Sequence, residues 1–273
     1  MPTILLTGAS GDLGRVLTDG LRDKGYRLRL SDIVARDDVP AECAFVRADL
    51  ADKDAVLGLC EGVDGIAHFG AISRENTFEA ILEANIRGTY HIFEGARLNR
   101  ARVVFASTNH TIGFHERSER LAEDCHFRPD SYYGLSKAYG ELLGRHYWDK
   151  HGVESAHLRI GSCFARPADV RQLSTWLSFA DLVELVDGCF RCEDLGCATF
   201  WGVSANERRW WTDHARELIR FTAADNAETF KDRVPPVPAD ADPIAERYQG
   251  GVFCADGYSR ATPAPKVLFR TSR

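Results

Sequence analysis

The chain has 273 residues, 44% of them hydrophobic, and a formal net charge of −6. This length is sufficient to bury a full core, whereas the acidic balance lacks the positive field that binding of a nucleic-acid backbone requires. No apolar run approaches the roughly 20 residues that span a bilayer. We therefore expect neither nucleic acid nor a membrane as a partner. Because residues 1–7 show no basic segment ahead of a hydrophobic stretch, we also expect a cytoplasmic protein.

The expected strands and helices alternate along the first 160 residues. The sequence predicts strands at 4–6, 26–33, 44–46, 65–69, 102–106 and 154–160, and helices at about 13–24, 52–60, 77–98 and 131–150. This alternation is typical of a doubly wound α/β fold, in which helices cover both faces of a parallel sheet.

The rhythm becomes irregular after Gly161, where Pro167 is followed by widely spaced tryptophans. We expect residues 1–165 to form the sheet domain and residues 166–273 to form a small substrate-binding lobe with a C-terminal tail, packed as one compact unit. From about Pro235 the tail is rich in Pro, Asp and Ala, which predicts an extended wrap or a frayed end.

Eight cysteines are scattered from position 43 to position 254, a spacing that does not form a compact disulfide framework, and we expect reduced thiols. Cys189 and Cys192 have the C-x-x-C spacing that can bind zinc, with Cys197 nearby. The same cysteines end an amphipathic helical pattern, and no second pair completes a tetrahedral set. We therefore expect no metal.

Three glycines, Gly8, Gly11 and Gly14, lie between the first strand and the first helix. In such a turn, backbone N–H groups and the helix dipole can face a pyrophosphate, which a Cβ would hold away from the backbone. An ordinary strand-to-helix turn also fits three glycines, but the strand–turn–helix context favours a dinucleotide and a Rossmann-type domain. Asp12 and Leu13 belong to this predicted contact surface.

The residue that ends the second strand bears on the choice of cofactor. Asp32 follows Gly8 by 24 positions, where a carboxylate can accept hydrogen bonds from the adenosine ribose and repel the 2′-phosphate of NADP. We predict NAD, although Arg36 is near enough in sequence to weaken this discrimination. Ile33, Asp49 and Leu50 are also predicted to contact the cofactor, and Asp49 equally fits an acid at a helix N-terminus.

Tyr133 and Lys137 are four residues apart, so that on a helix both side chains share one face. Tyr132 is about 140° away from Lys137 at 3.6 residues per turn. A phenol with a pKa near 10 needs nearby positive charge to act as a base at neutral pH, and Lys137 and an oxidised nicotinamide would supply it. A packed tyrosine with a solvated lysine also fits this spacing. The small hydroxyls of Ser107 and Thr108 at the end of the fifth strand favour the catalytic interpretation.

Together these motifs resemble the extended short-chain dehydrogenase/reductase superfamily, which they match through the glycine turn, Asp32, Asp49–Leu50, residues 85–89 and the Tyr133–Lys137 pair. Within it, the chain is similar to the uronate dehydrogenase family at residues 105–113, 159–163, 171–176, 201–206 and 249–251. The resemblance covers nearly all of the chain, up to residues 249–251.

The resemblance implies NAD-dependent oxidation of C1 of D-galacturonate or D-glucuronate to an aldaric acid lactone. It implies that Tyr133 removes the C1 hydroxyl proton, that Thr108 binds the same oxygen, and that Lys137 holds the nicotinamide ribose. Thr108 departs from the more usual serine. Arg171 is expected to bind the C6 carboxylate through two parallel hydrogen bonds, although a surface arginine fits the sequence as well. The remaining predicted contacts are Ser73, Asn109, His110 and Ser162 for the sugar, and Gly70, Ala71, Ile72, Asn85 and Ile160 for the cofactor.

Several alternatives stay open at this point. A nucleotide-sugar epimerase or dehydratase shares the same turn and tyrosine, and a non-catalytic NAD-binding regulator shares the fold. For His110, the alternative is a structural role in which its side chain only forms hydrogen bonds with backbone groups. The sequence does not distinguish galacturonate from glucuronate. The faces of the long helices favour a homo-oligomer without defining its stoichiometry.

Overall fold

A seven-stranded, wholly parallel sheet forms the centre of the computed structural model, which describes residues 1–212 and 214–265. The strand order is β3-β2-β1-β4-β5-β6-β9. Their bounds are β1 Thr3–Thr7, β2 Arg27–Asp32, β3 Ala44–Arg47, β4 Gly65–His68, β5 Arg102–Thr108, β6 Ser155–Ile160 and β9 Cys197–Gly202. The order reverses next to β1, which is the doubly wound arrangement predicted from the sequence.

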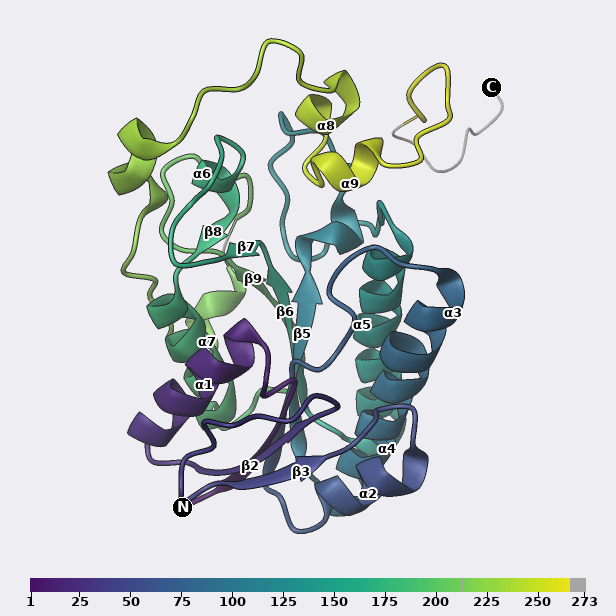
Figure 1. Ribbon diagram of the computed structural model, residues 1–273, viewed down its shortest axis with the longest axis vertical. Coiled ribbons are helices and arrows are strands. Elements are labelled where there is room, and N and C mark those ends of the chain that lie inside the picture. The colour runs from purple at the N-terminus through teal and green to yellow at the C-terminus, as the bar shows by residue number, and fades with distance from the viewer. Residues whose placement is uncertain (213, 266–273) are drawn as a thin grey trace.

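Helices cover both faces of the sheet (Figure 1). One layer consists of α1 Asp12–Asp23 and α7 Phe179–Arg191, and the other of α2 Lys53–Cys60, α3 Phe78–Ile81, α4 Gly88–Asn99 and α5 Tyr132–His151. Successive residues of a strand point to opposite faces, so Leu6 packs against the first layer and Leu5 against the second. Both clusters are therefore built from strands that are apolar on two sides.

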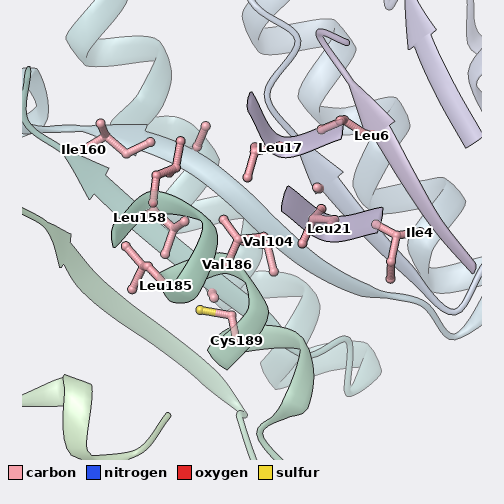
Figure 2. Packing of buried hydrophobic residues seen from close by; sticks show 14 of the residues in the cluster. Ile4, Leu6, Leu17, Leu21, Val104, Leu158, Ile160, Leu185, Val186 and Cys189 are labelled. Atoms are coloured by element: carbon pink, nitrogen blue, oxygen red, sulfur yellow. The ribbon is translucent and has the colours of Figure 1, made fainter. Parts of the chain in front are cut away.

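The first core cluster joins segments that are far apart in the chain. Leu185 and Val186 of α7 meet Leu17 and Leu21 of α1 over the strand residue Val104 (Figure 2). This packing places α7, and with it the start of β9, against the same sheet as α1. The division between residues 165 and 166 stays a prediction, but α7 and β9 beyond it clearly belong to these three layers.

Two features differ from the predicted elements. The expected helix at 77–98 is divided into α3, a π-helical turn at Leu82–Arg87 and α4. A seventh strand, β9, pairs with β6 in a region that was expected to be irregular. The first three residues of β9 are only partly buried at the sheet edge, so the strand lacks a strong apolar pattern in the sequence.

The tail also contains more regular structure than an extended wrap. Two short helices, α8 Pro243–Arg247 and α9 Val252–Ala255, lie above the carboxyl ends of the strands (Figure 1). The smaller elements are η2 Asn109–Ile112, β7 Ser162–Cys163, α6 Gln172–Thr175, β8 Trp176–Leu177, η3 Ala215–Glu217 and η4 Ala227–Arg233. Residues 266–273 of the predicted tail lie outside the described residues.

Candidate active site

A cavity of about 1110 Å³ opens at the carboxyl ends of the strands, below α8 and α9. Every site residue predicted from the sequence lines it except Asn85. Residues from both halves of the chain contribute, including Phe164, Pro236, Val252 and Phe253 from the region beyond β6. Parallel strands thus bring the glycine turn, the Tyr133 helix and Arg171 to one space, as expected for this sheet topology.

The glycine turn at one end of the cavity has a shape that lets a ligand come close to its backbone. Gly8 has a φ of +73°, and a Cβ at Gly14 would lie 2.0 Å from the Gly8 carbonyl oxygen. At Gly11 an added Cβ would make only an ordinary van der Waals contact, 3.5 Å from the Gly8 carbonyl oxygen. The turn leads directly into the N-terminus of α1. These features fit a dinucleotide pyrophosphate, which needs N–H donors and no side chain in its path.

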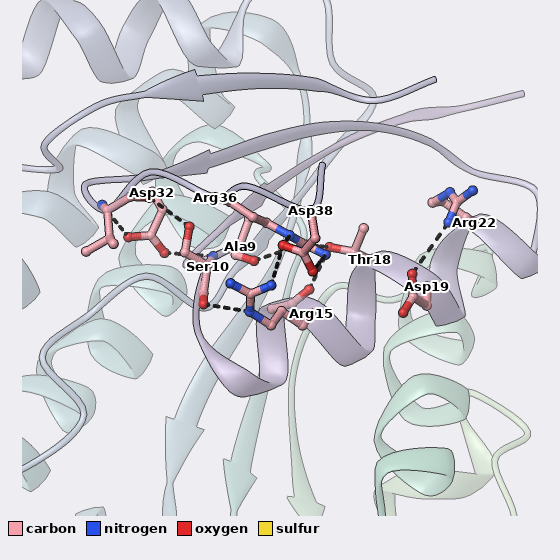
Figure 3. Close-up of polar contacts among 11 residues, drawn as sticks. Ala9, Ser10, Arg15, Thr18, Asp19, Arg22, Asp32, Arg36 and Asp38 are labelled. Carbon is pink, nitrogen blue, oxygen red and sulfur yellow. Dashed lines mark hydrogen bonds and ion pairs between the residues drawn. The ribbon is translucent and has the colours of Figure 1, made fainter. Parts of the chain in front are cut away.

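Asp32 and Arg36 occupy different environments at the adenosine end (Figure 3). Asp32 lines the cavity and accepts the Ser10 N–H at 3.0 Å. Arg36 is buried and donates to the Ala9 carbonyl at 3.0 Å and to the Thr18 hydroxyl at 2.7 Å, besides pairing with Asp38. Since these contacts hold the Arg36 guanidinium behind the turn, it does not line the cavity. The discrimination expected from Asp32 is therefore not offset by Arg36.

The predicted catalytic pair lies on the cavity-facing side of α5. Tyr133 is 8% exposed and Lys137 is 4% exposed. Burial raises the pKa of Tyr133 to about 12, and the Asp130 carboxylate adds to this rise, while a hydrogen bond with the Thr108 hydroxyl opposes it. The phenol is therefore a poor base before positive charge reaches it.

Lys137 is the group that sequence reasoning expects to supply such charge. Its ammonium lies 4.8 Å from the centre of the Phe105 ring and 6.0 Å from that of Tyr133. Burial lowers the pKa of Lys137 to about 7. None of the ion pairs among the described residues involves this side chain. A ligand that offers hydroxyl groups or negative charge would therefore stabilise the charged form.

Arg171 reaches the cavity from the turn before α6, where two contacts hold it. Its Nε donates to the Gln249 carbonyl oxygen at 2.8 Å. With the Asn109 amide oriented to satisfy its neighbours, Oδ1 accepts from Arg171 Nη2 at 2.8 Å and Nδ2 donates to the Ile160 carbonyl at 3.2 Å. Burial lowers the pKa of Arg171, but a guanidinium stays charged at neutral pH. The site thus presents an oriented cation.

His110 does not take the backbone-bonded role that the sequence left open. Its Nδ1 lies 2.7 Å from Asp130 Oδ2, and its ring packs against that of Phe253, tilted by 30°, with centres 3.9 Å apart. The ring centre is 5.9 Å from that of Tyr133. His110 is therefore fixed beside the phenol.

Comparisons with known proteins agree with this geometry. The NAD dependent epimerase/dehydratase family matches residues 4–180. A uronate dehydrogenase of Pseudomonas syringae pv. tomato is 47% identical, with 93% of this chain and 94% of that protein covered. The chain belongs to the uronate dehydrogenase family.

Solved structures of the family share the fold closely. An Agrobacterium tumefaciens uronate dehydrogenase, a mutant complexed with NAD, superimposes with a TM-score of 0.89 at 43% identity, covering 93% of this chain and 97% of that one. A glucuronic acid dehydrogenase from Chromohalobacter salexigens gives 0.90 at 40% identity, with the same coverage of both chains. The predicted membership and fold class are thereby confirmed.

Asn85, the predicted site residue outside the cavity wall, acts as a bridge in this uronate dehydrogenase family member. Its Oδ1 accepts the Ile72 N–H at 2.8 Å, and its Nδ2 donates to the Ile72 carbonyl and to Ser136 Oγ, both at 3.0 Å. The π-helical turn that carries Asn85 is a local irregularity of the kind often found at functional sites. Asn85 thus joins the loop after β4 to α5 behind the cavity.

Sequence reasoning missed several residues that organise the site. Glu75 accepts the backbone N–H groups of Tyr132 and Tyr133, Asp130 holds His110, and Phe253 covers the His110 ring. Each acts across at least 20 positions, so no local spacing reveals it. Gln249 carried a signal, because it belongs to a segment that resembles the family, and its buried side chain accepts the Trp211 indole N–H at 2.8 Å.

The cysteines are all free thiols in the structure. Cys189 is buried in the first core cluster, and Cys192 donates weakly to the Leu218 carbonyl at 3.5 Å. Over residues 1–212 and 214–265, no group of three His, Cys, Asp or Glu side chains is arranged to hold a metal ion. Within the same ranges, no helix has the length and apolar character needed to cross a bilayer.

Proposed function

We propose that the chain oxidises C1 of a cyclic hexuronate, D-galacturonate or D-glucuronate, to the aldaric acid lactone. One observation carries the proposal: a single cavity joins the glycine turn, the Tyr133–Thr108 hydroxyl pair and an oriented Arg171. These are a dinucleotide cradle, an acid/base group and a carboxylate receptor. Membership of the uronate dehydrogenase family supports the same reaction.

The cofactor is NAD, and its oxidised nicotinamide supplies the hydride acceptor when bound. Gly8, Gly11 and Gly14 offer it a cradle without side chains, at the N-terminus of α1. Asp32 receives the ribose hydroxyls, and Lys137 holds the second ribose. Because hydroxyl acceptors next to Lys137 favour its ammonium form, this contact stabilises positive charge beside Tyr133.

Tyr133 takes the proton in the proposed reaction. As the C1–H bond breaks, the C1 hydroxyl proton passes to the Tyr133 oxygen, and C1 becomes the carbonyl carbon of the lactone. The Thr108 hydroxyl bonds the reacting oxygen and, in the structure, already lowers the cost of the phenolate. Positive charge from Lys137 and from the cofactor counteracts the burial that raises the pKa of Tyr133.

Arg171 selects the substrate in this scheme. A planar guanidinium can bind the C6 carboxylate through two parallel hydrogen bonds, which a neutral hexose cannot form. Asn109 and the Gln249 carbonyl hold the arginine in place. Ser73, His110 and Ser162 line the same space and offer hydrogen bonds to the sugar hydroxyls.

The direct test is NADH formation, followed by absorbance, with galacturonate, glucuronate and a neutral hexose. We expect turnover of one or both uronates and very weak turnover of the neutral sugar. Tyr133→Phe should abolish hydride transfer while NAD binding, measured by calorimetry, persists. Equal turnover of the neutral hexose would remove the uronate assignment, and an active Tyr133→Phe variant would remove the proton-transfer role.

The proposal also includes the oligomeric state and the cellular location of the protein. Large apolar side chains are exposed along α4 and α5, among them Leu98, Leu135 and Leu142, which favours a homo-oligomer. The free thiols support a cytoplasmic location. Light scattering after size-exclusion chromatography tests the first point, and cell fractionation tests the second. A monomer, or recovery outside the cytoplasm, would contradict them.

A further inference from the structure

The Asp130 carboxylate is completely enclosed immediately before α5. Its side chain has no exposed surface. Oδ1 accepts the Ser131 hydroxyl at 2.7 Å, while Oδ2 lies 2.7 Å from His110 Nδ1. Such a buried carboxylate is expensive unless hydrogen bonds satisfy it, so these partners are needed for its stability.

Glycines on two further segments leave room for this carboxylate. A Cβ at Gly113 would lie 1.8 Å from Asp130 Oδ2, and a Cβ at Gly250 would lie 2.0 Å from the same atom. Gly113 follows η2, whereas Gly250 precedes α9 in the C-terminal part of the chain. Three segments thus close around one acid that does not itself line the cavity.

The contact determines which nitrogen of His110 carries hydrogen. An ionised carboxylate only accepts hydrogen bonds, so Nδ1 must donate to Asp130. In the neutral imidazole, Nε2 is then an acceptor. No hydrogen bond among the described residues engages Nε2, and His110 lines the cavity. Close packing against the Phe253 ring restricts rotation of the His110 ring.

We propose that Asp130 is a positioning residue that keeps His110 in the Nδ1–H form, so that Nε2 accepts a hydrogen bond from a hydroxyl of the bound hexuronate. The proposal rests on the proposed function for its substrate, but the state of His110 can be tested without it. A sugar hydroxyl can donate to Nε2, whereas the Nε2–H form would instead demand an acceptor at that point. Asp130 therefore acts on substrate recognition through His110.

The kinetic test is Asp130→Asn, because an amide can either accept from Nδ1 or donate to it and no longer specifies the tautomer. We expect the KM for the uronate to rise about tenfold, the loss of roughly one hydrogen bond. The KM for NAD should stay within about threefold. An unchanged uronate KM, or an equal rise for NAD, would overturn the proposal.

A second histidine–carboxylate pair provides a matched control. His115 Nδ1 lies 2.7 Å from Glu119 Oε2, the same separation as in the Asp130 pair, and neither residue lines the cavity. Glu119→Gln should leave the KM for the uronate within about twofold. A rise equal to that of Asp130→Asn would show that loss of any such pair disturbs the site, against the proposal.

A spectroscopic measurement covers the case in which Asp130→Asn does not fold. Long-range ¹H–¹⁵N correlation spectra of the wild-type protein report the tautomer of each histidine, and His110→Gln assigns the His110 signal among the nine histidines. We expect the Nδ1–H form, and the Nε2–H form would overturn the proposal. If wild-type protein oxidises no uronate, the proposed function fails, while the spectrum still decides the tautomer.

Discussion

The Glu75 carboxylate accepts the backbone N–H of Tyr133 at 2.9 Å, across 58 positions of the sequence. Its other oxygen accepts the Tyr132 N–H at 3.0 Å. The first N–H groups of a helix lack partners within the helix, and a negative charge is favourable there. The loop that follows β4 and lines the cavity therefore also determines where α5, the helix that carries Tyr133, begins.

We predict that Glu75→Ala destabilises the protein by about 1–3 kcal/mol, because two charge-assisted bonds to the helix N-terminus are lost. It should also lower kcat more than it changes the KM for NAD, since Tyr133 is the second residue of α5. Urea unfolding and steady-state kinetics measure both effects. Glu79→Ala, at an exposed position of α3, is the control and should be near neutral. Similar losses in the two variants would refute the capping role.

Lys137 should lower the stability of the cofactor-free protein. Burial lowers the pKa of Lys137 from 10.5 to about 7, so in that range the unfolded chain binds more protons than the folded one. Stability is therefore reduced most below pH 7 and recovers as the pH rises towards 10.5. Lys137→Met should gain on the order of 2–4 kcal/mol at pH 7 and lose catalysis.

Thermal unfolding of both proteins at pH 7 and pH 10 measures this effect. We expect the gain from Lys137→Met to shrink at the higher pH. A gain that is equal at the two pH values, or a loss of stability at pH 7, would contradict the pKa shift caused by burial.

Replacement of Arg171 should weaken binding of the uronate but not binding of NAD. We predict that Arg171→Ala raises the KM for uronates about 100-fold, because a bidentate charged contact of about 3 kcal/mol is removed. Arg171→Lys should recover little of this loss, since an ammonium lacks the planar pair of donors. Arg166→Ala changes the net charge equally at an exposed position outside the cavity and should have little effect. An equal change in the KM for NAD would exclude the carboxylate contact.

Asp32 should control the preference for NAD over NADP. In Asp32→Ala the repulsion of a 2′-phosphate disappears, so the ratio of kcat/KM for NADP to that for NAD should rise by about tenfold or more. Asp37→Ala removes the same charge from an exposed position outside the cavity wall, and its ratio should not change. Kinetics with both cofactors measure the ratios. A wild-type preference for NADP would show that Asp32 does not have this role.

The sequence by itself determined the features that depend on short spacings. Alternating apolar runs predicted six parallel strands, the three glycines predicted a tight turn between the first strand and the first helix, and the four-residue spacing placed Tyr133 and Lys137 on one helix face. All three are confirmed as structure. A strand, a turn and a helix face each repeat over a few residues, so their physical cause lies within the local chain.

Only the tertiary structure decided how these parts act together. The edge strand β9 was missed because its N-terminal half is only partly buried, and pairing with β6 rather than its own apolar pattern places it. Glu75 reaches Tyr133, Asp130 reaches His110, and the Gln249 carbonyl reaches Arg171 across 78 positions. These polar contacts have no period in the sequence, because hydrogen bonds between distant segments form only after the sheet has brought their loops to one edge.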